Sequence, residues 1–153
     1  MTQTSAVPFV TGHIGLNVAD LSRSIEFYQH VFGFDLKGRS DQEGRAYAFL
    51  GSGDTLVLTL WQQASGSAPT NRPGLHHLSF QVPSLAAVKA AEEKVRTAGA
   101  TIHHGGIVPH REGAASGGLF FEDPDGIRLE VFAPDGAGTS AAPHAHAPTC
   151  GFF

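Results

Sequence analysis

The chain has 153 residues, 41% of them hydrophobic, and a net charge of −4, which suits one compact domain or two small fused modules. This acidic balance offers no basic surface for nucleic acid or an anionic membrane, and no apolar run reaches the roughly 20 residues that span a bilayer. The single cysteine, Cys150, cannot form an intramolecular disulfide, and the first residues lack the pattern of a signal peptide, so we expect a cytoplasmic protein.

A repeated strand pattern is the first organising feature. Residues 12–21 resemble residues 76–85, and His13 and His77 occupy the same place in the two copies. Both segments alternate as half-buried strands do, so each histidine lies opposite the apolar row of its strand. A repeat at this distance predicts two copies of one structural unit.

Each of these strands leads into a predicted helix. The first helix is predicted at 21–32, with Asp20 as its N-cap and Gly33 as its stop, and the second at 85–98, between Ser84 and Gly99. Three short strands are predicted after each helix, at 34–40, 45–50 and 55–62 and then at 101–104, 118–122 and 127–132.

The chain therefore divides into four parts. We predict a βαβββ module at 10–62, a Ser, Ala, Gly and Pro-rich linker at 63–73, a second βαβββ module at 74–133 and a flexible C-terminal tail at 134–153. The fold class is α+β, with the paired modules forming a cupped mixed sheet. The last two residues, both phenylalanine, either extend into solvent or dock into an apolar groove.

Strand parity points to a metal site. In the last strand Glu130 lies opposite the apolar row, as His13 and His77 do in theirs. If the modules pack about a pseudo-two-fold axis, these three side chains converge on one concave surface. Two imidazoles and one carboxylate suit a single divalent ion, Fe(II), Mn(II), Zn(II) or Ni(II), and leave coordination positions open. Chance placement is the alternative, and the turn before Glu130 favours the metal.

Several motifs together resemble the vicinal oxygen chelate superfamily. They are the two histidine-led strands at 13–18 and 77–82, the Ser-Ile-Glu-Phe-Tyr segment at 24–28 and the Asp-Pro-Asp-Gly turn at 123–126 with the ligand Glu130 after it. That superfamily includes glyoxalase I, fosfomycin-resistance thiol transferases, extradiol dioxygenases, methylmalonyl-CoA epimerase and bleomycin-binding proteins. The resemblance implies homodimers of paired βαβββ modules and one metal, with ligands at His13, His77 and Glu130. It also implies substrates that chelate the metal through two neighbouring oxygens.

Departures from the family pattern narrow the expected reaction. Glyoxalase I and the epimerase have a fourth Glu or Gln ligand at the position that we match to Val57, and the thiol transferases have a Thr where this chain has Gly15. Extradiol dioxygenases share the three-ligand set and have a His upstream of a Tyr. Here His110 is upstream with slightly long spacing, and Phe120 replaces the Tyr.

We therefore expect a mononuclear metal-dependent, dioxygenase-like enzyme that acts on a small substrate with adjacent oxygens. Fe(II) or Mn(II) is the favoured ion, and a homodimer the favoured assembly. His110 is the candidate acid or base, since an imidazole titrates near neutral pH, and Trp61, Phe120 and Arg128 are candidate substrate contacts. The alternatives are a metal-free drug-binding protein of the bleomycin-binding type and a lyase, isomerase or thiol transferase of the same superfamily.

Overall fold

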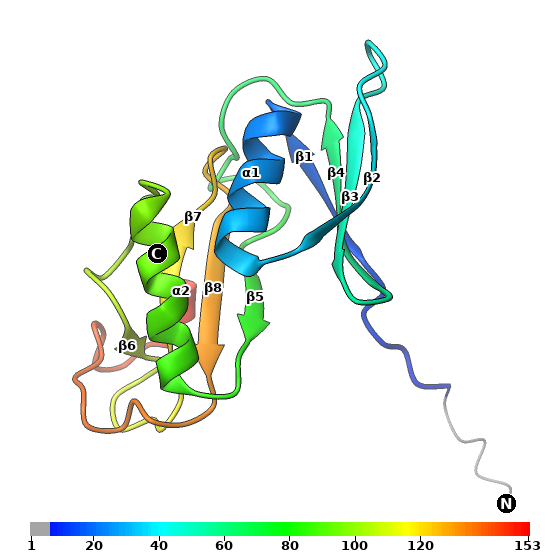
Figure 1. The fold of residues 1–153 in the computed structure, drawn as a ribbon. Helices are drawn as coiled ribbons and strands as arrows, with labels where there is room; N and C mark the ends of the chain where they lie inside the picture. Colours follow the sequence, from blue (N-terminus) through cyan, green and yellow to red (C-terminus); the bar gives the residue numbers. More distant parts are fainter. Residues whose placement is uncertain (1–6) are drawn as a thin grey trace, which may run out of the picture.

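The computed structural model describes residues 7–153, which form two βαβββ modules joined by a long loop (Figure 1). The first module comprises β1 (Ile14–Val18), α1 (Leu21–Phe32), β2 (Asp35–Ser40), β3 (Tyr47–Ser52) and β4 (Thr55–Gln62). The second comprises β5 (Leu78–Gln81), α2 (Leu85–Thr97), β6 (Val108–Pro109), β7 (Gly117–Glu122) and β8 (Arg128–Ala133), and a short 3-10 helix (Thr149–Gly151) follows. The predicted α+β class with paired modules is confirmed. Neither α-helix among these residues is long and apolar enough to cross a membrane.

Both helices begin where their capping residues predict. The Asp20 side chain accepts a hydrogen bond from the amide of Arg23, and the Ser84 side chain accepts one from the amide of Ala87. The first helix ends at Gly33, whose φ of 69° is the left-handed conformation that glycine adopts without strain. The helices therefore start directly after β1 and β5, as the repeat requires.

Each module has its own four-stranded mixed sheet. The strand orders are β1-β4-β3-β2 and β5-β8-β7-β6, and the first pair in each sheet is parallel while the others are antiparallel. Gly15 lies opposite Thr59 in the first parallel pair, and Ser79 lies opposite Glu130 in the second. The two sheets thus use the same register.

The second module departs from prediction in one strand. Residues 101–104, expected to form a full strand, make only an isolated bridge from Ile102 to Phe121. His104 has a φ of 58°, a left-handed conformation, and two glycines follow it, so the extended backbone ends there. Pairing with β7 resumes only at β6, which is two residues long.

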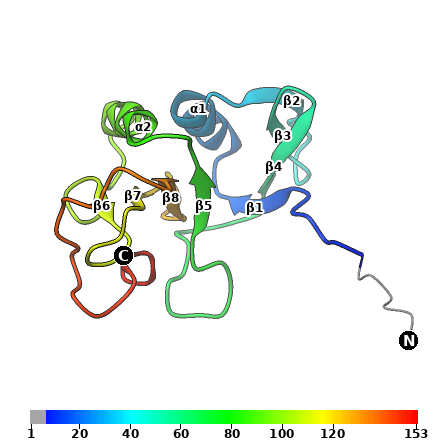
Figure 2. The same cartoon turned by 90° about the horizontal axis from the view of Figure 1, so that it is seen from below.

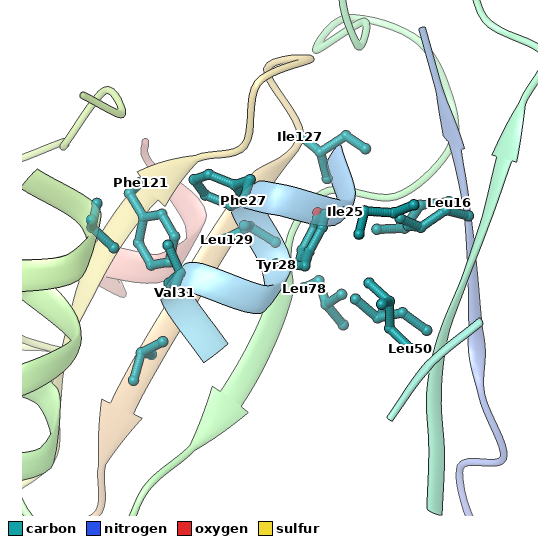
Figure 3. Close-up of a cluster of buried hydrophobic side chains, with 14 of the residues drawn as sticks. Leu16, Ile25, Phe27, Tyr28, Val31, Leu50, Leu78, Phe121, Ile127 and Leu129 are labelled. Atoms are coloured by element: carbon teal, nitrogen blue, oxygen red, sulfur yellow. The ribbon is translucent and has the colours of Figure 1, made fainter. Parts of the chain in front are cut away.

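Helix α1 lies between the two sheets and joins the modules. Figure 2 shows α1 and α2 next to each other, and Figure 3 shows α1 side chains packed on both sides. On one side Ile25 packs toward Leu16 of its own module. On the other, the Phe27 ring lies 6.4 Å from that of Phe121, and the C-terminal Phe32 lies 4.7 Å from Phe80. One continuous hydrophobic core therefore spans both modules.

The segment after β8 lies against the second module. The amide of Ala137 donates to the Ala115 oxygen at 2.8 Å, and the amide of Thr149 donates to the His110 oxygen at 2.7 Å. The Thr149 hydroxyl also donates to the Pro109 oxygen at 2.7 Å, and this side chain is fully buried. In Figure 2 the C-terminal end lies on the side of the second sheet away from α2. The sequence composition predicts a flexible tail for this segment. Composition alone does not reveal the hydrogen bonds that hold the segment against the second module.

Candidate functional site

Two of the three predicted metal ligands meet on the outer face of the second sheet. Glu130 is in the middle of β8 with its side chain 4% exposed, and its Oε2 lies 3.6 Å from Nε2 of His77. The register of β5 and β8 produces this approach, because Ser79 pairs with Glu130. His77 precedes Ser79 by two residues, and in an extended chain such residues share a face. Strand parity predicted this pair from the sequence.

The imidazole of His77 is biased toward its neutral form. Partial burial is the largest cause that lowers its pKa, and the positive charges of His76 and Arg128 act in the same direction. The carboxylate of Glu130 opposes them and raises the pKa, and the net direction is downward. A neutral imidazole is the form that binds a metal ion.

His110 lies on the other side of Glu130. Its Nε2 is 2.5 Å from Oε1 of Glu130, and its Nδ1 is 2.8 Å from the hydroxyl of Ser116. A carboxylate only accepts hydrogen bonds, so Nε2 of His110 is the donor to Oε1 of Glu130. The two oxygens of Glu130 are thereby divided, one toward His110 and one toward His77. The sequence identified His110 as a site residue, whereas the role of Ser116 gave no recognisable signal.

The third predicted ligand is not brought to this pair. His13 is exposed and immediately precedes β1 in the other module. Within residues 7–153 there is no group of three or more His, Cys, Asp or Glu side chains arranged to hold an ion. The first and second sheets do not form one cup in a single chain, because α1 lies between them (Figure 1).

The predicted substrate contacts divide in the same way. Phe120 pairs directly with Glu130 across β7 and β8, is fully buried and lies on the same face. Arg128 is two residues before Glu130 on that strand, and its buried Nε has no hydrogen-bond partner within the described chain. Trp61 lies in the first sheet instead, 37% exposed, with its ring 5.5 Å from that of Tyr47.

The register also corrects the position expected for a fourth ligand. The sequence suggested Val57, but the counterpart of Glu130 in the first module is Thr59, since Gly15 pairs with Thr59 as Ser79 pairs with Glu130. The Thr59 hydroxyl is buried and accepts a hydrogen bond from the indole of Trp61 at 3.0 Å. The conclusion drawn from Val57 is unchanged, because Thr59 also supplies no carboxylate or amide.

The donor set fits a divalent ion in part. Ligand atoms about 2.0–2.2 Å from one ion lie roughly 3–3.5 Å apart, close to the 3.6 Å between His77 Nε2 and Glu130 Oε2. Imidazole nitrogen and carboxylate oxygen are common ligands of Fe(II), Mn(II) and Zn(II). Two donors leave such an ion under-coordinated, so a further ligand has to come from elsewhere.

Sequence reasoning missed one aromatic residue of the site. The ring of Phe153 lies 5.6 Å from that of His77 and 5.2 Å from that of Phe120, and the Arg128 guanidinium carbon is 5.3 Å from its centre. The pair of phenylalanines after a segment rich in Ala, Gly and Pro was the available signal. That signal did not decide whether the two rings extend into solvent or dock on the protein. In the structure the Phe153 ring docks on the second sheet.

Comparisons with known proteins agree with this fold. A family model described as the Glyoxalase/Bleomycin resistance protein/Dioxygenase superfamily matches residues 11–131. The chain is 33% identical over 124 residues to a lactoylglutathione lyase of Neisseria meningitidis, covering 77% of this chain and 86% of that protein. It is 28% identical over 124 residues to a catechol-2,3-dioxygenase of Bacillus subtilis, covering 80% of this chain but only 40% of that protein.

Solved structures show the same architecture. A glyoxylase/bleomycin resistance protein/dioxygenase domain from Frankia superposes with a TM-score of 0.65 at 24% identity, covering 84% of this chain and 98% of that one. The fosfomycin resistance protein FosX of Listeria monocytogenes, solved with Mn(II) and sulfate, has a TM-score of 0.63 at 18% identity, with 83% and 93% covered. At these identities the likeness concerns the fold.

Proposed function

This chain belongs to the glyoxalase/bleomycin resistance protein/dioxygenase superfamily, and on that premise we propose that it is a mononuclear metal-dependent enzyme of the dioxygenase-like type. Its substrate would be a small molecule with two adjacent oxygens. The observation that carries the proposal is the approach of His77 Nε2 to Glu130 Oε2, 3.6 Å apart on the outer face of the second sheet. Relatives at comparable identity include both a dioxygenase and lyases, so the reaction type rests on the donor set.

The proposed ligands are His77 and Glu130 of one chain and the partner's His13 in a homodimer. His13 holds the place in the first module that His77 holds in the second, and it is exposed. A second copy can present it, whereas the same chain keeps it in the other sheet. Closed two-fold dimers create two identical sites, each completed by the other subunit.

The residues around this pair have distinct proposed roles. A divalent ion held there would polarise a substrate oxygen as a Lewis acid, and Fe(II) or Mn(II) suits oxygen chemistry. His110 would fix one oxygen of Glu130 and exchange protons with the substrate, being 2.5 Å from that carboxylate. Arg128 would neutralise negative charge on a bound substrate, and the buried Phe120 would exclude water beside it. The proposed contact through Trp61 would come from the partner's first sheet.

The donor set favours the dioxygenase-like reaction over the lyase reaction. Thr59 takes the place where a fourth, carboxylate donor would stand, so no second carboxylate is available for proton transfer at the ion. A metal-free drug-binding protein, another of the alternatives, would not require the joint presence of His77 and Glu130.

Metal analysis of the protein purified without chelator tests the proposal. We expect about one divalent ion per chain, and its loss in Glu130→Gln and His77→Ala but not in His30→Ala, a control on the exposed face of α1. Anaerobic reconstitution with Fe(II) or Mn(II), followed by oxygen uptake with a panel of catechols, then tests the reaction. A chain that never retains metal would exclude the enzyme, and metal retention without oxygen uptake would exclude ring cleavage.

A further inference from the structure

The ring of Phe153 lies on the face of the second sheet on which His77 and Glu130 meet. Besides His77 and Phe120, it contacts His103 at 5.4 Å between ring centroids, with Arg128 close to its centre. Its neighbours come from β7, from β8 and from the residues just before β5, so the ring spans the sheet. The Arg128 side chain also directs one amino group toward the main-chain oxygen of Phe153, at 3.5 Å.

The segment that carries this ring is anchored at Thr149, at the start of the 3-10 helix. Thr149 is fully buried and makes two hydrogen bonds of 2.7 Å, one from its amide to His110 and one from its hydroxyl to Pro109. Phe152, next to Phe153, is 55% exposed, and its nearest ring is His144 at 5.5 Å. The two phenylalanines therefore differ sharply in environment, and only one faces the ligand pair.

A molecule bound to an ion at His77 and Glu130 has to lie on this same face, since the opposite side of the sheet is covered by α2 and the core. Phe153 already takes up that space. We propose that residues 149–153 form a displaceable plug over this face of the second sheet, with Thr149 as its anchor and Phe153 as the occupant.

The plug has a thermodynamic consequence. A ligand that binds only the open form has its apparent affinity reduced by the fraction of molecules in which the plug is displaced. A Cβ added at Gly151, between anchor and ring, would meet no atom within 4 Å, so the backbone there has room to rotate and carry Phe153 off the face while Thr149 stays bound. This consequence for substrate rests on the proposed function, whereas the occupancy of the face by Phe153 does not.

Chemical modification of histidine measures the occupancy directly. The protein, stripped of metal, is treated with diethylpyrocarbonate at pH 7, and the rates at His77 and His103, the two imidazoles beside the Phe153 ring, are followed by peptide mass spectrometry. In Phe153→Ala we expect these rates to rise about tenfold as the covered fraction falls. The matched control Phe152→Ala should leave them unchanged, and His30 on α1 should react at one rate in every variant.

A second variant keeps the test independent of the ring. Thr149→Val removes the hydroxyl bond to Pro109 at nearly constant volume, so it should raise both rates partially, with circular dichroism unchanged. Addition of the peptide Thr-Cys-Gly-Phe-Phe to a chain ending at Pro148 should restore protection. Equal rates in wild type, Phe153→Ala and Thr149→Val would overturn the plug. Because the assay uses metal-free protein, the plug can stand when the metal proposal fails, and the reverse also holds.

Discussion

The hydroxyl of Tyr28 donates a hydrogen bond to Oδ2 of Asp123 at 2.9 Å, across 95 residues of sequence and with both side chains buried. Asp123 Oδ1 accepts the amides of Asp125 and Ile127 within its own turn, at 2.9 and 2.8 Å. Burial raises the pKa of Asp123, while these hydrogen bonds act to lower it. The helix of the first module is thereby tied to the turn that leads into β8 and Glu130.

Replacing Tyr28 with phenylalanine should destabilise the fold. The change leaves a buried carboxylate oxygen without its donor, which costs about 1–3 kcal/mol in the free energy of unfolding. Urea unfolding followed by circular dichroism measures this loss. Tyr47→Phe is the matched control, because the Tyr47 hydroxyl has no hydrogen bond among residues 7–153, and it should change stability by less than about 0.5 kcal/mol. Equal effects of the two substitutions would contradict the importance of the Asp123 contact.

The same tyrosine makes stability depend on alkaline pH. Burial first, and then the negative charge of Asp123, raises the pKa of Tyr28 well above its ordinary value of 10.0. Above pH 10 the unfolded chain loses this proton while the folded chain keeps it, so unfolding becomes more favourable as pH rises. Wild-type stability should fall by about 1.4 kcal/mol per pH unit more steeply than that of Tyr28→Phe in this window. Parallel slopes from pH 10 upward would show that Tyr28 ionises in the folded protein.

His110 should affect metal affinity through Glu130. In His110→Phe the carboxylate loses the donor 2.5 Å from its Oε1, and loss of such a supporting contact typically weakens metal binding about 10–100-fold. Ser116→Ala, one step further out, should have a smaller effect of the same sign. Competition with a fluorescent chelator measures both constants. Unchanged affinity in His110→Phe would reduce His110 to a proton-transfer role alone.

Mixed dimers test where the third ligand comes from. His13→Ala and Glu130→Gln proteins should each fail to retain metal, yet a refolded equimolar mixture should recover about a quarter of the wild-type sites, since half of the dimers are mixed and each has one intact site. A site built within one chain would recover nothing. Metal content after gel filtration measures the recovery, with each variant refolded alone as control.

A glycine in β7 controls the path of the chain after β8. A Cβ added at Gly117 would lie 2.5 Å from that of Ala137 and 2.9 Å from the Val108 oxygen. Gly117→Ala should therefore cost about 1–3 kcal/mol and release residues 134–153 to limited proteolysis. Gly138→Ala is the control on the same segment, since its nearest contacts are an ordinary 3.8 Å. Equal protease resistance in the two variants would contradict this packing.

Local patterns were sufficient for most of the fold. Asp20, Gly33 and Ser84 placed the helix ends, because capping depends on neighbouring residues alone. Alternation placed His77 and Glu130 on one face, since side chains alternate in any strand. The strand expected at 101–104 failed because the left-handed His104 and the glycines after it interrupt pairing, which an apolar–polar pattern does not reveal.

The remaining features depend on long-range packing. The module arrangement is set by contacts such as Phe32 with Phe80 and Tyr28 with Asp123, which no local pattern encodes. For that reason the sequence predicted that His13, His77 and Glu130 converge, but left open whether one chain or two supplies them. The docking of Phe153 likewise depends on a surface assembled from three distant segments.

The equivalence of Thr59 and Glu130 gives the repeat an evolutionary reading. Two copies of one unit provide two equivalent positions for a carboxylate. In this chain only the second copy has a carboxylate there, Glu130. The first copy has the hydroxyl of Thr59 at this position, and that hydroxyl accepts a hydrogen bond from the indole of Trp61. A single substitution at position 59 would change the number of side chains that can bind an ion, without moving any strand. Duplicated scaffolds of this kind can therefore diversify in chemistry one residue at a time, while their architecture stays constant.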